Sequence, residues 1–114
     1  MLLEELCLSD MFEAAEAIEN FCNRITYDQF EGDDMRRSAI LQKLIVIGEA
    51  AGRLTPKFTD RYPNVPWMDI VELKNIAVHR YFVMQWGGVW LTAVEEIPIL
   101  RKQIDDVLRK EFGN

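Results

Sequence analysis

Apolar residues recur every three or four positions through the first twenty-odd residues of the chain. This spacing places them on one face of an α-helix and predicts an amphipathic helix there. The apolar positions are Leu3, Cys7, Met11, Ala14, Ile18 and Phe21. The segment that follows, ITYDQFEGDD, mixes turn formers with two aromatic residues, and we expect it to form a turn. Asp33 or Asp34 at its end is suited to cap the next helix.

A second helix is predicted from that cap to about Leu54, and it is apolar on two faces. One stripe consists of Ile40, Leu44, Ile47, Ala51 and Leu54, and the other consists of Leu41, Ile45, Gly48 and Gly52. A helix with two apolar faces is expected at the centre of a fold. The two glycines lie one turn apart and permit the backbone of another helix to approach closely, either from the same chain or from a second subunit.

Prolines predict where the third helix begins. Pro56, Pro63 and Pro66 break the chain into a connector, and Pro66 suits the first turn of a new helix. Asn64 is the candidate cap of this helix. Its expected buried stripe consists of Trp67, Ile70, Leu73 and Ala77.

The third helix is expected to end in RYFVMQWGG, with Gly87 and Gly88 as a loosened junction. Helical spacing resumes at Val89 and continues to about Phe112. The apolar positions there are Trp90, Ala93, Ile97, Leu100, Ile104 and Val107. Pro98 should kink this element or split it in two. Because no segment alternates with the period of a strand, the sequence predicts one all-α domain over residues 1–114, a bundle of four or five helices.

Composition supports a globular protein, since 49% of the 114 residues are hydrophobic and 28% are charged. No apolar run reaches the roughly 18 residues that a membrane span requires. The N-terminus carries acids where a signal peptide needs bases, so we expect a cytoplasmic protein that does not enter a membrane. Cys7 and Cys22 are then expected to be reduced thiols. With one histidine and no metal-ligand motif, the sequence predicts neither a metal site nor a cofactor.

Charge is distributed unevenly along the chain. The net charge is −6, which argues against a general nucleic-acid binder. Residues 1–34 hold ten acids against Arg24 alone (−9), and the remaining residues hold twelve bases against nine acids (+3). The acidic end is interpreted either as the solvated face of a helix or as a surface that docks a basic partner or a neighbouring subunit.

Reactive side chains are concentrated in LKNIAVHRYF, residues 73–82. A histidine with a pKa near neutrality can take the proton from a ribose 2′-hydroxyl or protonate the leaving 5′-oxygen. His79 would do this while Lys74 stabilises the charge that accumulates on phosphorus. Asn75, one turn before His79, can orient the imidazole or donate to a phosphate oxygen. These residues favour RNA cleavage without a metal, although a histidine at a helix C-terminus also fits a purely structural role.

Four motifs follow one another along the chain. They are GEAAGRL (residues 48–54), P-x-x-P-W (63–67), K-N-x-x-x-H-x-Y-F (74–82), and V-W followed by I-P-x-L (89–100). In their order and intervals the chain resembles HEPN-domain proteins of the HepT-like type, the ribonuclease toxins of MNT/HEPN toxin–antitoxin pairs. The resemblance covers nearly the whole chain.

The resemblance implies an antiparallel helical bundle that forms a homodimer with a composite, metal-independent ribonuclease site. It also implies a partner, a minimal nucleotidyltransferase antitoxin that adenylylates the tyrosine of an R-x4-H-x-Y motif. When the motif is matched to this sequence, its histidine corresponds to His79, its polar residue to Asn75 and its tyrosine to Tyr81. The motif's arginine is replaced by Lys74, which keeps the charge but lacks the planar fork that grips phosphate in two places. Arg80 is the candidate to supply a guanidinium, although one position along a helix turns a side chain by about 100°.

Two other functions remain open on this evidence. The chain can be a non-catalytic HEPN module that binds a nucleotide or an RNA end, or the substrate-binding half of a nucleotidyltransferase. A catalytic role favours a dimer, because acid–base cleavage uses two proton-transfer groups and each chain has one histidine, unless water or a lysine serves as the second group. Glu49 and Arg53 are spaced to form a surface pair, with the alternative that Glu49 reaches the site. The three tryptophans are interpreted as core residues, with base stacking as the alternative.

Overall fold

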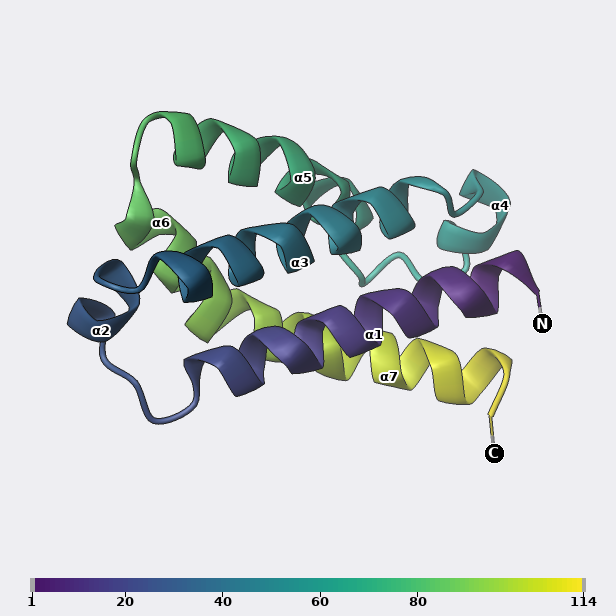
Figure 1. The fold of residues 1–114 in the computed structure, drawn as a ribbon. Helices are drawn as coiled ribbons and strands as arrows, with labels where there is room; N and C mark the ends of the chain where they lie inside the picture. The colour runs from purple at the N-terminus through teal and green to yellow at the C-terminus, as the bar shows by residue number, and fades with distance from the viewer. Residues whose placement is uncertain (1, 114) are drawn as a thin grey trace.

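Four long helices form the body of the computed structural model, which describes residues 2–113 (Figure 1). They are α1 (Leu3–Cys22), α3 (Asp34–Gly52), α5 (Trp67–Phe82) and α7 (Ile97–Glu111). The shorter elements are α2 (Tyr27–Glu31), α4 (Pro56–Thr59), α6 (Trp86–Leu91) and the π-helical turn η1 (Thr92–Glu96). Every regular element within residues 2–113 is a helix, which confirms the all-α bundle. No described helix has the length and apolar character needed to cross a membrane.

The helix that is apolar on two faces, α3, lies between α1 and α5, and α1 packs in turn against α7 (Figure 1). Neighbouring long helices run antiparallel, so the first and last helices bring both ends of the chain to the same end of the bundle. The core is contributed by all four long helices, and its largest fully buried side chains are Phe30, Leu8, Met11, Ile18, Ile40, Ile47, Ile97, Ile104 and Val89. Most positions of the predicted stripes are therefore buried. The exceptions are two exposed residues, Leu3 and Gly52, and four partly buried ones, Phe21, Ile45, Trp67 and Trp90.

The start of α3 confirms one predicted cap. Asp33 is the N-cap residue, and its carboxylate accepts a hydrogen bond of 3.0 Å from the Arg36 amide. The segment before it was expected to be a turn, but it contains the short helix α2. Thr26 forms a capping box with Gln29, and Phe30 is fully buried in the core. The capping box and the burial of one aromatic side chain together stabilise a helix of five residues.

Two predictions about α5 were wrong. Asn64 does not cap the helix, because Pro66 occupies the N-cap position and makes no side-chain cap. Gly87 and Gly88 do not form the junction at its end but lie inside α6. The helix ends earlier, in a Schellman motif with Met84 in the left-handed region at φ 56°. The Gln85 amide donates to the Arg80 carbonyl at 2.9 Å and the Met84 amide to the Tyr81 carbonyl at 3.2 Å.

Pro98 splits the last helical region, as predicted. Thr92–Glu96 form a π-helical turn, in which the Ile97 amide donates to the carbonyl five residues before it, at Thr92. Pro98 then occupies the first turn of α7, where its missing amide hydrogen is not required. The change of helical register thus accommodates the proline without leaving an unpaired position inside a helix.

Gly48 brings the backbones of α3 and α5 into contact. A Cβ atom at this position would lie 2.7 Å from the Lys74 amide nitrogen and 3.0 Å from the Val71 carbonyl oxygen. The second apolar stripe of α3 is therefore covered by a helix of the same chain at this point. Gly52 differs, because a Cβ atom there would meet only a methyl group of Val71 at 3.9 Å.

We predict that Gly48→Ala lowers the free energy of unfolding by about 1–3 kcal/mol, because the added methyl group must push α5 away from α3. Gly52→Ala is the matched control. It should leave stability unchanged or raise it by up to about 1 kcal/mol, because alanine favours a helix and has room at this position. Urea denaturation followed by circular dichroism measures both variants, and equal stabilities would contradict the tight contact at Gly48.

Candidate active site on helix α5

The last two turns of α5 expose most of the residues that the sequence singles out. The helix buries Ile70, Leu73 and Ala77 against the core, so the opposite side faces solvent. Asn75 and His79 lie on this exposed side. His79 and the short loop that follows α5, residues 83–85, are exposed in the single subunit. The helix therefore holds these groups on a regular, packed element and not on a loop.

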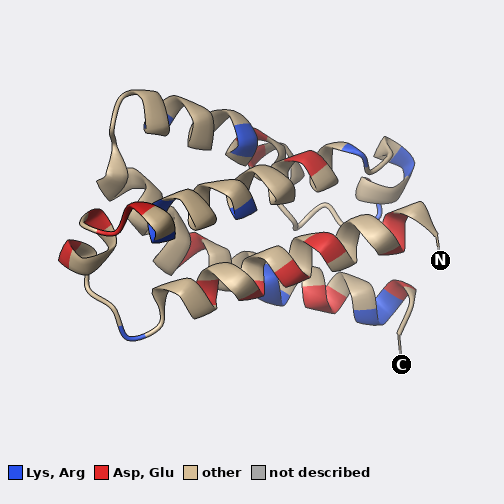
Figure 2. Cartoon of the chain, in the orientation of Figure 1, with Lys and Arg blue, Asp and Glu red and all other residues tan. Residues whose placement is uncertain are grey.

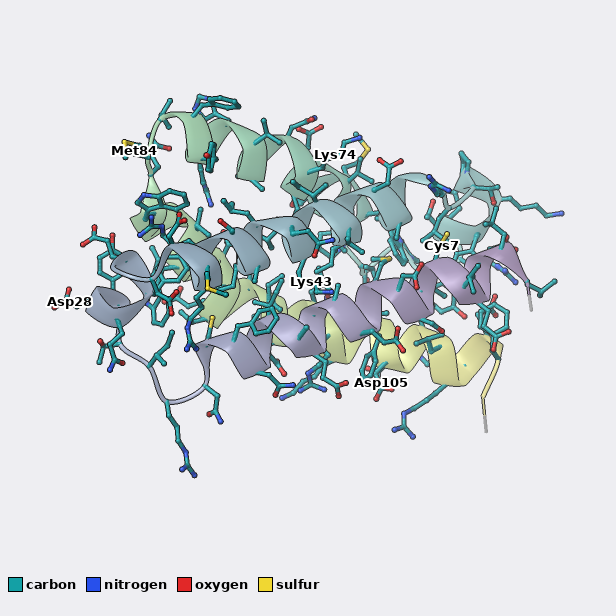
Figure 3. All side chains as sticks on the ribbon, viewed as in Figure 1. Cys7, Asp28, Lys43, Lys74, Met84 and Asp105 are labelled. Atoms are coloured by element: carbon teal, nitrogen blue, oxygen red, sulfur yellow. The ribbon has the colours of Figure 1, made fainter. Side chains whose placement is uncertain are left out.

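Lys74 lies on the edge of α5 that faces α3 and binds a carboxylate there (Figure 3). Its Nζ atom is 3.0 Å from Oε2 of Glu49, and the other oxygen of the same carboxylate, Oε1, is 3.4 Å from Nη2 of Arg53. The hydrogen bond from Lys74, followed by the Lys74 charge and the hydrogen bond from Arg53, lowers the pKa of Glu49. The predicted pair of Glu49 with Arg53 is confirmed, and Glu49 also reaches Lys74.

His79 and Lys74 leave α5 in different directions. Five positions along an α-helix correspond to a rotation of about 140°, so Lys74 points toward α3 while His79 points into solvent. Asn75 shares the His79 side, but its amide nitrogen is 3.5 Å from Oε2 of Glu72. The structure thus places the three predicted catalytic side chains on one segment without bringing them to one point. Their catalytic roles remain predictions.

Arg80 is held inside its own subunit. Its Nη1 atom donates to the Gly88 carbonyl at 2.8 Å and to Oγ1 of Thr92 at 2.9 Å, and the Thr92 hydroxyl donates to Oε2 of Glu96 at 3.2 Å. Thr92 is buried, and a Cβ atom on Gly88 would lie 3.0 Å from Cζ of Arg80. The close approach at Gly88 therefore makes room for the guanidinium. A phosphate contact, which stays a prediction, would compete with these bonds.

The Arg80 network is a feature that sequence reasoning missed. It joins Arg80 at the end of α5 to Gly88 of α6, eight residues later, and to Thr92 of η1, twelve residues later. The helical spacing of the sequence does not predict contacts between residues in different helices. One sign was available in retrospect: Gly88 lies within a helix, where glycine is unfavourable unless something approaches closely. The network fixes the turn of α5 that carries His79 and Tyr81.

Tyr81 is half exposed and lies among other aromatic rings. Its ring centroid is 5.3 Å from that of Phe82 and 6.0 Å from that of Trp86, in both cases edge to face. Trp86 in turn carries the guanidinium of Arg37 over its ring at 4.7 Å. All three tryptophans are partly buried against the core, which confirms their interpretation as packing residues.

An apolar groove of about 310 Å³ lies between α3 and α5 beside Tyr81. Its lining residues are Ser38, Leu41, Gln42, Ile45, Ala77, Val78, Tyr81 and Phe82. Phe82 of this lining is 77% exposed, and Met35, which precedes Ser38 by one turn of α3, is 84% exposed. Such a cluster of exposed apolar side chains is typical of a surface that another molecule covers.

Most of the acidic residues among the first 34 lie on α1 and α2 (Figure 2). The exposed side of α5 also carries an acid, Glu72, beside Asn75. On α1, Asp10, Glu13 and Glu16 are exposed to solvent. Glu19 instead forms an ion pair of 2.8 Å with Arg101 of α7. This acidic N-terminal part of the chain therefore has a solvent-exposed face and contributes a contact between helices through Glu19, and the docking of a basic partner or a neighbouring subunit stays a prediction.

The cysteines are free thiols, as expected. Burial raises the pKa of Cys22 to about 11 and also raises the pKa of Cys7. Across residues 2–113, no group of three or more His, Cys, Asp or Glu side chains is arranged to hold a metal ion.

Comparisons with known proteins match almost the whole chain. The family model described as "Ribonuclease HepT-like" matches residues 11–107. Two candidate RNases of Methanocaldococcus jannaschii are similar to this chain. One is 34% identical over 88% of this chain and 92% of its own length. The other is 31% identical over 93% of this chain and 88% of its own length. A candidate ribonuclease HepT of Thermococcus cleftensis is 32% identical, covering 90% and 93%. No solved structure matches the chain.

Proposed function

Because the chain belongs to the HepT-like ribonuclease family, we propose that it is a cytoplasmic, metal-independent endoribonuclease. In this proposal it is the toxin of a type II MNT/HEPN toxin–antitoxin pair, and a nucleotidyltransferase antitoxin silences it by adenylylating Tyr81. The observation that carries the proposal is the exposed His79 on a rigid helix, followed two residues later by a half-exposed tyrosine. RNA is the proposed substrate.

The proposed reaction is an intramolecular transesterification. An imidazole of His79 takes the proton from a ribose 2′-hydroxyl, and the 2′-oxygen attacks the adjacent phosphorus. The bond to the 5′-oxygen breaks, and this oxygen takes a proton from a second acid. Lys74 stabilises the negative charge on the phosphoryl oxygens, and Asn75 orients the imidazole or the phosphate. The products are a 2′,3′-cyclic phosphate and a 5′-hydroxyl end.

A homodimer is part of the proposal, because one subunit has one histidine and directs Lys74 and His79 to different sides. A second copy can supply the missing proton-transfer group. The apolar groove between α3 and α5, with exposed Phe82 and Met35 beside it, is the surface we assign to this contact. Gly48 does not contribute to the contact, since α5 already covers it.

We predict that the isolated protein sediments as a dimer at micromolar concentration. Phe82→Asp should shift it to a monomer, because the substitution places a charge in the apolar contact. Ile99→Asp is the control, since Ile99 is 61% exposed but lies on α7. A wild-type monomer would remove both the interface and the shared site.

We predict that His79→Ala abolishes RNA cleavage and that Lys74→Ala slows it by ~10²–10³, the usual effect of deleting a transition-state donor. Lys74→Arg should keep or raise activity, because a guanidinium holds phosphate with two parallel hydrogen bonds. The measurement is single-turnover cleavage of a labelled RNA in the presence of EDTA, which should not inhibit. Products that end in a free 3′-hydroxyl would point to metal-assisted hydrolysis instead.

A second candidate function is a non-catalytic module that binds RNA or presents Tyr81 to the nucleotidyltransferase. The observation that favours it is Lys74, which replaces the arginine of the motif and is paired with Glu49. A wild type and a Lys74→Arg variant that are both inert would support this alternative. The third possibility, the substrate-binding half of a nucleotidyltransferase, requires that the partner be inactive without this chain.

We predict that Tyr81→Phe cleaves RNA nearly as well as the wild type but is no longer silenced by the nucleotidyltransferase. Adenylylation adds a negatively charged phosphate close to His79, where it competes with substrate for charge and space. The measurement is growth on co-expression, together with the intact mass of the purified chain. Tyr62→Phe, a change at a partly buried tyrosine, is the control that should remain silenced. If Tyr81→Phe is silenced without modification, the partner acts by occlusion.

A further inference from the structure

Two basic side chains from different helices converge on one carboxylate at the junction of α3 and α5. Lys74 of α5 binds Oε2 of Glu49 at 3.0 Å, and Arg53 at the end of α3 binds Oε1 at 3.4 Å. The other ion pairs within residues 2–113 each join one basic side chain to one carboxylate. The pair of cations around Glu49 is therefore unlike the ordinary surface pairs of the chain.

The backbone fixes the positions of these groups. At Gly48, the residue before Glu49, α3 touches the backbone of α5 at Lys74, so the two helices cannot slide past one another there. Arg53 follows Glu49 by one helical turn and is the C-cap residue of α3. The spacing of the two cations thus follows from a packed contact between helices and from the helical period.

We propose that Arg53 and Lys74 together bind one phosphodiester of the RNA, and that Glu49 occupies this anion site in the free protein. The two oxygens of a carboxylate and two non-bridging oxygens of a phosphodiester are recognised by the same donors. Arg53 supplies from α3 the guanidinium that the motif on α5 lacks. This inference takes its ligand, RNA, from the proposed function, but it does not require that the protein cleave RNA.

The exchange of Glu49 for a phosphate is favourable on physical grounds. The side chains of Arg53, Glu49 and Lys74 are 63%, 47% and 43% exposed, and ion pairs exposed to this degree contribute little to stability. The displaced carboxylate can turn into solvent. Binding of a phosphodiester also releases counterions from the nucleic acid, which adds a favourable term that an internal carboxylate does not have.

Charges near the pair restrict the direction from which RNA approaches. A groove between α1 and α3 reaches Arg53 from the other side, and its lining includes Asp10 as well as Glu49. A phosphate there would be repelled by Asp10. RNA therefore approaches the proposed site from the α5 side, where Lys74 lies.

The test uses a 2′-O-methyl RNA oligonucleotide, which binds like RNA but lacks the hydroxyl needed for cleavage. Its dissociation constant is measured by fluorescence anisotropy over a range of salt concentrations. Arg53→Ala should weaken binding severalfold and reduce the magnitude of the salt slope by about 0.7, the value for one phosphate contact on a single strand. Glu49→Gln should strengthen binding, because the internal anion is removed. Adding Arg53→Ala to Glu49→Gln should cancel most of that gain.

Arg109 and Asp105 offer a matched control. They form an exposed ion pair with the same spacing of four residues, at 3.0 Å, on α7. Arg109→Ala and Asp105→Asn should change the dissociation constant by less than twofold. If Arg53→Ala behaves like Arg109→Ala, or if Glu49→Gln weakens binding, the proposed phosphate site is wrong.

Cleavage of unmodified RNA by the wild type is measured in parallel, so that the two proposals can fail separately. If the wild type cleaves RNA but the Arg53 and Glu49 variants bind the oligonucleotide as the wild type does, the phosphate site is wrong and the ribonuclease function stands. Binding that responds to the variants as expected, without cleavage, supports the phosphate site and removes the catalytic function. A wild type that does not bind the oligonucleotide overturns the phosphate site whether or not it cleaves RNA.

Discussion

The backbone contact between α3 and α5 at Gly48 is the constraint on which the geometry of the site depends. A single methyl group at this position would overlap the Lys74 amide, so the distance and the register between the two helices are set there. Lys74 is consequently placed opposite Glu49, and the helical period places Arg53 one turn further along α3. A structural requirement for glycine thus determines which charges meet on the surface.

The same helix is anchored a second time near its C-terminus, by polar contacts instead of backbone contact. Arg80 donates to the Gly88 carbonyl and to the buried hydroxyl of Thr92, which belongs to the π-helical turn. These bonds join the end of α5 to the segment that follows Met84, the left-handed residue at which the chain reverses. His79 lies beside Arg80 in this anchored turn. The segment that carries the reactive side chains is therefore held at both ends and can keep them in place on an exposed surface.

Charge is organised locally in this protein. The net charge of −6 opposes binding of nucleic acid, but most of the acidic excess lies on α1 and α2 (Figure 2). The groove between α3 and α5 beside Tyr81 is lined mainly by apolar side chains, and the Lys74, Glu49 and Arg53 cluster lies where the two helices meet near Gly48. In the proposed site, Lys74 and Arg53 supply the positive charge that attracts an anionic ligand to this junction.

Residues three or four positions apart determined the long helices and most of their buried positions, and the residue types before α3 limited its cap to Asp33 or Asp34. The order of motifs pointed to the segment that carries His79 and to the family. The tertiary structure decided which helix covers Gly48 and that Arg80 meets Thr92. It also decided that α5 ends at Phe82 and that Met84 follows it in the left-handed conformation usually associated with glycine. These features depend on how the loops orient the helices, and packing between distant segments leaves no periodic signal in the sequence.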